Sequence, residues 1–131
     1  MANYTELIIG CSLSADTPID VIRIIKSIVL GKNLPKGISL PLSIYGLDQR
    51  NPIRSTSSYF GVRTEHTMFV QDSSGQWMLS TRSSCTNGSN EIERFLSYIR
   101  PYIVKGSGAK DIYAMTIGEE DSNYKIYSLT Q

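Results

Sequence analysis

The sequence predicts an α+β fold in which a mostly antiparallel β-sheet carries two helices packed on one face. Two segments have apolar residues at helical spacing, and five to seven others alternate apolar and polar residues as strands do. Most of these strands follow one another through short turns, which favours antiparallel pairing over a doubly wound parallel sheet. At 131 residues the chain has the size of one domain, so we expect a single α+β domain over residues 1–131.

A strand and a helix are predicted at the start of the chain. Residues 4–13 place apolar side chains at alternate positions, which is typical of a strand with one buried face. A helix is predicted over residues 17–30, with Thr17 as its N-cap, Pro18 at its first position and Gly31 at its end. The buried stripe expected for this helix comprises Ile22, Ile25 and Val29.

The middle of the chain is expected to be mainly β. Because a proline interrupts it, the run at residues 40–45 predicts an edge strand or an extended loop. Candidate strands then cover residues 57–63, 67–71 and 76–82, and residues 72–75 offer Asp-Ser-Ser-Gly as a hairpin turn between the last two. These strands predict an antiparallel meander.

The last part of the chain predicts a second helix and a hairpin. A polar loop over residues 83–90 precedes the helix, and Pro101 within its apolar pattern should kink the helix near Ser97 or end it near Arg100. Residues 111–117 and 124–129 predict two more strands around an acidic turn. The buried residues expected on the second helix are Ile92, Phe95, Leu96 and Ile99.

Charge and hydropathy exclude several classes of protein. Thirteen basic residues against twelve acidic ones give a net charge of +1, which lacks the positive footprint of a general nucleic-acid binder. No apolar run approaches the roughly 18 residues of a membrane span, and the start of the chain lacks the basic and apolar pattern of a secretory signal. We therefore expect no membrane partner and a cytoplasmic location.

The inventory of reactive side chains is small. His66 is the single histidine, and Cys11 and Cys85 stand alone in unlike contexts, so we expect two reduced thiols, with one disulfide as the alternative. No spacing indicates a metal site, and no cofactor or catalytic residue is predicted. A small hydrolase-like enzyme that uses His66 or Cys85 with a serine-rich pocket remains an alternative, although the sequence has no Gly-x-Ser-x-Gly motif.

Arginines and aromatic residues form the one distribution that suggests a ligand. Between residues 37 and 104 every basic residue is arginine, whose planar fork suits bidentate recognition of phosphate or carboxylate. These arginines interleave with aromatic rings, which would suit a small, anionic, nucleotide-like ligand. In the competing interpretation the aromatic residues belong to the core and the arginines pair with acidic residues on the sheet surface. The candidate ligand-binding residues are Arg54, Tyr59, Arg63, Trp77 and Arg82.

Four segments and one helix start resemble small proteins of phages, prophages and bacterial genomes that carry no established activity. They are residues 57–60, 77–84, 90–96 and 98–103, together with Asp16-Thr17-Pro18. The resemblance covers about half the chain and includes no catalytic signature, so it transfers no functional residue. What it implies is an accessory protein of phage or mobile-element type, for which binding host machinery in an anti-defence role is common.

The leading hypothesis is therefore a non-catalytic binding protein. It would be a phage or mobile-element accessory factor that binds a host protein or sequesters a small anionic ligand. The alternatives are the small enzyme described above and a structural or self-assembling subunit, which a large apolar face reaching an edge strand would favour.

Overall fold

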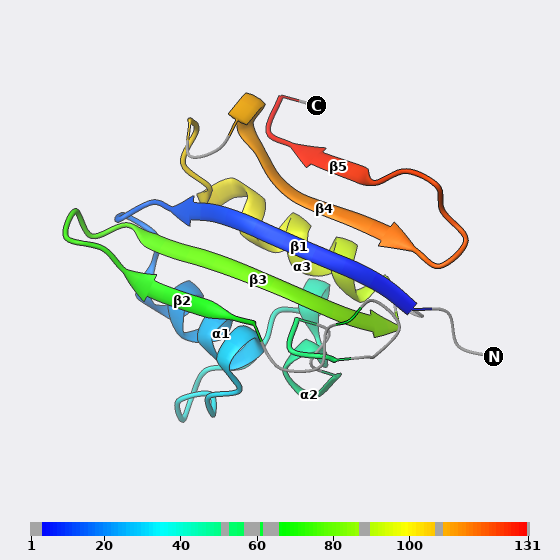
Figure 1. The fold of residues 1–131 in the computed structure, drawn as a ribbon. Coiled ribbons are helices and arrows are strands. Elements are labelled where there is room, and N and C mark those ends of the chain that lie inside the picture. Colours follow the sequence, from blue (N-terminus) through cyan, green and yellow to red (C-terminus); the bar gives the residue numbers. More distant parts are fainter. Residues whose placement is uncertain are drawn as a thin grey trace.

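The computed structural model describes residues 4–50, 53–56, 61, 66–86, 90–106 and 109–130, and it has the expected α+β arrangement (Figure 1). Within these residues, five strands form one antiparallel sheet in the order β2-β3-β1-β4-β5. The strands are β1 Tyr4–Leu13, β2 Met68–Gln71, β3 Trp77–Thr86, β4 Ile112–Gly118 and β5 Lys125–Ser128.

Two longer helices lie on the same side of this sheet (Figure 1). The α-helices are α1 Ile19–Leu30, α2 Leu47–Arg50 and α3 Glu91–Ile99. Three short 3₁₀ helices accompany them: η1 Leu42–Ile44, η2 Arg100–Tyr102 and η3 Ala109–Asp111. On the opposite side of the sheet, the described part of the chain places no helix (Figure 1).

Helix α1 ends as expected but begins differently. Gly31 adopts a left-handed φ of 69° and its N–H donates to the Lys26 carbonyl, which satisfies one of the last helical acceptors. At the other end Pro18, with extended backbone, is the N-cap. The predicted capping role of Thr17 is wrong, because Pro18 is the N-cap and no side chain accepts a hydrogen bond from the first helical N–H groups. The Thr17 hydroxyl instead donates to the Ser14 carbonyl at 2.6 Å.

Strand β3 is longer than its sequence indicates. Residues 83–86 were expected in a polar loop, but they continue the strand because β1 offers a pairing partner along their whole length. Ser83 lies opposite Leu7 and Cys85 lies opposite Thr5. The hairpin around residues 72–75 is confirmed, with the Asp72 N–H donating to the Gln76 carbonyl at 2.8 Å. Beyond it the meander ends, since the other neighbour of β3 is β1.

Two further segments complete the comparison with the predicted elements. The run at residues 40–45 contains the 3₁₀ helix η1, for which Pro41 is the N-cap, so the edge-strand alternative is wrong. The second helix ends near Arg100 as predicted and continues as η2 with Pro101 inside it. The candidate strand at residues 57–63 lies, apart from Gly61 in a turn, outside the described residues.

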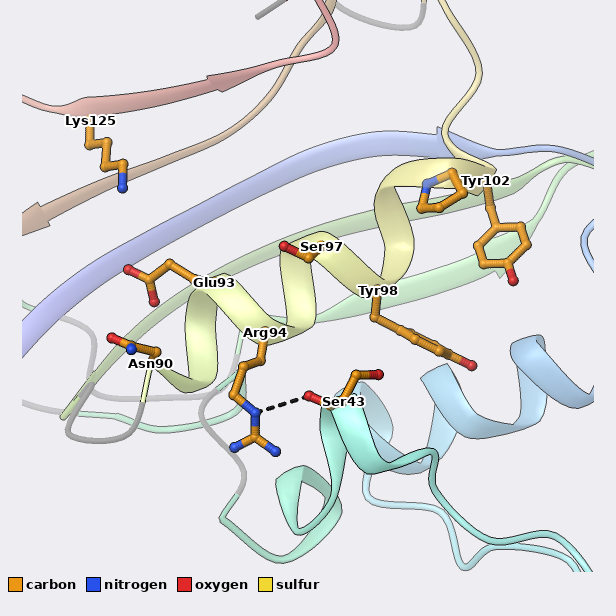
Figure 2. A pocket seen from close by; sticks show the side chains of 9 residues that line it. Ser43, Asn90, Glu93, Arg94, Ser97, Tyr98, Tyr102 and Lys125 are labelled. Carbon is orange, nitrogen blue, oxygen red and sulfur yellow. Dashed lines mark hydrogen bonds between the residues drawn. The ribbon is translucent and has the colours of Figure 1, made fainter.

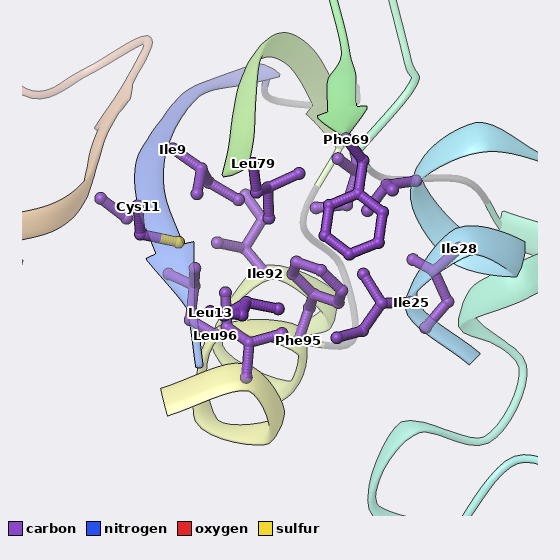
Figure 3. Close-up of a cluster of buried hydrophobic side chains, with 14 of the residues drawn as sticks. Ile9, Cys11, Leu13, Ile25, Ile28, Phe69, Leu79, Ile92, Phe95 and Leu96 are labelled. Carbon is purple, nitrogen blue, oxygen red and sulfur yellow. The ribbon is translucent and has the colours of Figure 1, made fainter. Parts of the chain in front are cut away.

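The hydrophobic core lies between the helices and one face of the sheet (Figure 3). Every core residue predicted on the two helices is buried, and Phe95 is completely inaccessible. From the sheet, β1 contributes the alternate residues Leu7, Ile9 and Leu13, each at most 1% exposed. We call this side of the sheet the helix face. The burial of its central side chains stabilises the fold and leaves the other face of the same strands to be explained.

Candidate functional site

The described members of the predicted ligand site do not lie together. The guanidinium of Arg54 lies beside Gly31, at the end of α1. Trp77 lies on the helix face, where its ring stacks on Phe69 at 5.1 Å and the Lys26 ammonium sits 4.5 Å above it. Arg82 points to the opposite side, and the remaining two candidates, at positions 59 and 63, lie outside the described residues.

Strand geometry explains why Trp77 and Arg82 separate. They are five residues apart on β3, and successive side chains of a strand point to opposite faces. Trp77 pairs with Leu13, which faces the helices, whereas Arg82 pairs with Ile8, which does not. The sequence alone could have predicted this separation, since both residues lie in the predicted strand 76–82 and are an odd number of positions apart.

Arg82 of β3 belongs to a polar network with Glu6 of β1 and Tyr124, the residue just before β5. Its Nε and Nη2 each lie 2.6 Å from Oε2 of Glu6, and the Tyr124 hydroxyl donates to Oε1 of the same carboxylate at 3.0 Å. Glu6 is only 4% exposed even though no helix covers it, because Arg82 and Tyr124 lie over it. This hydrogen bond to the carboxylate raises the pKa of Tyr124. A small anion at Arg82 would have to compete with Glu6 for the guanidinium.

Around this network the second side of the sheet carries apolar side chains interspersed with serines and Gly10. Side chains that lie opposite one another in register share a face, so one row runs from Arg82 through Ile8 and Met115 to Ile126. The next rows place Met68 beside Ser80 and Gly10, and Val70 beside Met78 and Ser12. We call this surface the open face; its apolar strand residues are Ile8, Met68, Val70, Met78, Met115, Ile117 and Ile126.

The open face exposes large hydrophobic groups on both edge strands. Met68 and Val70 of β2 are 46% and 42% exposed, and Ile126 of β5 is 42% exposed. Among the strand residues described on this face, the charged ones are Glu6 and Arg82, which neutralise each other. Among the described strand residues, the open face therefore carries no net charge, and it has exposed apolar side chains on both edges with Ser12, Ser80 and the Glu6–Arg82 pair between them.

A shallow hollow interrupts the open face beside its central strand. Gly10 is exposed, and a Cβ added there would meet no atom within 4 Å. The hollow has a volume of about 200 Å³ and is lined by β1 and β4, from Ile8 and Gly10 to Tyr113 and Met115. The apolar strand face thus offers a recess that one side chain can enter.

A larger hollow of about 810 Å³ lies over the outer face of α3, between η1 and β5 (Figure 2). Arg94 uses its Nε and Nη2 to hold the Ser43 and Tyr45 carbonyls at 3.0 and 2.8 Å, which ties η1 to the helix. Glu93 points to the other side of α3, the side of Lys125 (Figure 2). Since its cations lie on two sides of the helix and a carboxylate lies among them, this hollow does not gather positive charge for an anion.

The candidate nucleophile is not activated. Burial, together with the nearby carboxylates of Glu91 and Glu93, raises the pKa of the Cys85 thiol to about 12, so the thiol stays protonated at neutral pH. Burial alone raises the pKa of Cys11 to about 12 as well. Both cysteines are free. Cys85 lies opposite Thr5, six residues from Cys11 along β1 or about 20 Å, far too distant for a disulfide.

The described residues also show no arrangement that supports a role for His66 as a general base or for a metal site. His66 is exposed just before β2; of the serines considered for it, Ser84 is buried and Ser80 is exposed. No group of three or more metal-ligating side chains gathers in the part of the chain that the structure describes. The helices among those residues are all too short or too polar to cross a bilayer.

Comparisons with protein-family models, with curated proteins and with solved structures found no match to this chain. The resemblance to small phage and prophage proteins therefore stays a prediction. The open face is the surface that the sequence reasoning missed, and it did leave a signal. Leu7-Ile8-Ile9 is apolar on both sides of one strand, which a sheet covered on a single face does not require.

Proposed function

We propose that this protein is a non-catalytic binding protein that acts by protein–protein contact through its open face. The observation that carries the proposal is the exposure of apolar side chains on both edge strands of this sheet face, where the charged residues of the described strands, Glu6 and Arg82, form an ion pair. Monomeric proteins rarely expose contiguous apolar patches larger than a few hundred Å² unless the patch binds something.

The composition of the open face also favours a protein over a small anion. Burying apolar surface contributes roughly 25 cal/mol per Å², and such surface is what a partner protein can cover. Tyr124 and Arg82 stand at one end of the face, and both residue types are enriched among the residues that dominate binding energy in interfaces. Because Glu6 already binds the Arg82 guanidinium, this group is better suited to packing within an interface than to binding a phosphate.

The partner is one of two kinds that the sequence left open, a host protein or a second copy of the chain. Both are compatible with the proposed cytoplasmic location. The proposal needs only that the open face is covered when the protein works.

Thiol labelling in cells tests this proposal. In Ile126→Cys the new thiol lies on the open face, whereas Cys11 and Cys85 are buried thiols with raised pKa values and should react slowly. Leu42→Cys is the control on η1, away from the open face; because Leu42 is 90% exposed and Ile126 42%, each labelling rate in cells is divided by the rate of the same purified, dilute variant. In the cells that naturally carry the protein, we expect a maleimide to label position 126 at least about tenfold more slowly than position 42. Equal labelling would show an uncovered face and would contradict the proposal.

A further inference from the structure

We propose that the hollow over α3 is a binding site for a short, uncharged oligosaccharide of about two or three sugar rings. The inference goes beyond the proposed function, because α3 and the open face lie on opposite sides of the sheet (Figure 1). The volume of about 810 Å³ falls within the roughly 300–1,000 Å³ that small-ligand sites occupy. Three features of the hollow favour this ligand: its aromatic rings, its neutral polar groups and its charges.

Two tyrosine rings line one part of the hollow (Figure 2). Tyr98 and Tyr102 are four residues apart, so they lie on the same side of α3 and of the turn η2 that continues it. Their ring centroids are 6.4 Å apart and their planes meet at 64°, so one ring presents its edge to the other. Such a corner offers ring surface to a compact, partly apolar ligand. A pyranose ring is such a ligand, because its faces carry C–H groups and its rim carries hydroxyls.

Neutral polar groups surround the two rings. Ser43 lines the hollow from η1, and Asn90 and Ser97 line it from α3 and its N-cap. Among the described residues, these three side chains and the two tyrosine hydroxyls have no hydrogen-bond partner. A hydroxyl both donates and accepts hydrogen bonds, and a side-chain amide also offers both functions. These groups therefore match the hydroxyls of a sugar, which donate and accept in the same way.

The charges of the hollow favour a sugar over an anion or a proline-rich peptide. Arg94 directs two of its N–H groups to main-chain carbonyls at 3.0 and 2.8 Å, and the Glu93 carboxylate lies on the side of Lys125 (Figure 2). That carboxylate would repel a phosphate. A proline-rich segment, which aromatic grooves commonly bind, has few N–H groups to donate to it. The hydroxyls of a sugar can donate to Glu93 while its ring packs on the tyrosines.

Isothermal titration calorimetry of the purified full chain tests the inference. The ligands are the uncharged trisaccharides cellotriose, maltotriose, mannotriose, galactotriose and triacetylchitotriose, each titrated to about 10 mM. We expect at least one of them to bind with a dissociation constant between about 10 µM and about 1 mM. Adenosine monophosphate and a decaproline peptide, titrated in the same way, should not bind.

Substitutions within the hollow locate the site. Tyr98→Ala should raise the dissociation constant at least about tenfold by removing one ring, and Ser97→Ala, at an exposed position, should raise it about three- to tenfold. Glu93→Gln should also weaken sugar binding, whereas it would strengthen the binding of an anion. Tyr45→Ala is the matched control, because Tyr45 is 71% exposed and lies outside the described lining of the hollow. It should leave the dissociation constant unchanged.

Three outcomes would overturn the inference. The first is that no trisaccharide binds, and the second is that adenosine monophosphate or decaproline binds while the sugars do not. The third is sugar binding that neither Tyr98→Ala nor Ser97→Ala weakens, with both variants folded by circular dichroism, since the sugar would then use another surface. None of these results changes the labelling of position 126, so the proposed function is tested separately.

Discussion

The two faces of the sheet carry similar apolar residues, but one face is buried and the other is exposed. On the helix face, Leu7, Ile9 and Leu13 of β1 are at most 1% exposed, because α1 and α3 cover them. On the open face, Ile126 and Val70 are each 42% exposed although they are equally apolar. Hydrophobicity alone therefore does not decide which face becomes core. The comparison teaches that one face holds the monomer together, while the other is free to contribute to association.

A matched pair of truncations should show the largest difference between the faces. We expect Ile9→Ala, at a position 1% exposed, to lower the free energy of unfolding by about 2–5 kcal/mol through lost contacts and a cavity. Ile126→Ala, at a position 42% exposed, should lower it by less than about 1 kcal/mol in the monomer. Urea unfolding at a protein concentration too low for association measures both. Similar losses at the two positions would break the distinction between the faces.

A smaller effect should distinguish the covered ion pair of the open face from an exposed one. Arg82→Ala leaves the Glu6 carboxylate, which is 4% exposed, without its main partner, and we expect a loss of about 1–3 kcal/mol. Arg23→Ala removes the pair of Arg23 with Asp20, a longer contact of 3.7 Å between exposed side chains, and should cost less than about 1 kcal/mol. Thermal unfolding of both variants provides the comparison. An Arg82→Ala variant as stable as the parent would remove the structural role assigned to Arg82.

The smallest effect should be a pH dependence at Tyr124. Its pKa is raised because the hydroxyl donates to Glu6, so the proton is held more tightly in the folded protein than in the unfolded chain. This contribution to stability is fully present below the unfolded pKa of about 10 and is lost as pH rises through the raised folded value. The stability difference between the parent and Tyr124→Phe should therefore stay constant up to about pH 9 and shrink as the pH rises above about 10. A difference that stays constant or grows above about pH 10 would contradict the hydrogen bond.

Local pattern was sufficient for the helices and for most strands. The spacing of Ile92, Phe95 and Ile99 predicts which side of α3 is buried, because a helix of 3.6 residues per turn brings them to one face whatever they pack against. The turn at residues 72–75 was equally local, since Asp72 and Gly75 supply its geometry themselves.

The polar end of β3 and the predicted ligand site required long-range information. Ser83 and Ser84 carry no apolar pattern that predicts a strand. They become part of β3 because they pair with Leu7 and Glu6 of β1, which lie far earlier in the chain. The same pairing supplies Glu6 as the partner of Arg82, which no local spacing indicates. The alternation of side chains along a strand already predicts that Trp77 and Arg82 point to opposite faces. The interpretation of a shared ligand site overlooked this.

By itself the sequence determined the class of fold, the positions of both long helices and their buried faces, because these depend on residues close together in the chain. Alternation along residues 4–13 also determined which side of β1 is buried, because Leu7, Ile9 and Leu13 share one face. Only the tertiary structure decided the strand order β2-β3-β1-β4-β5 and the partners of the polar end of β3, because strand pairing joins residues that lie far apart in the chain.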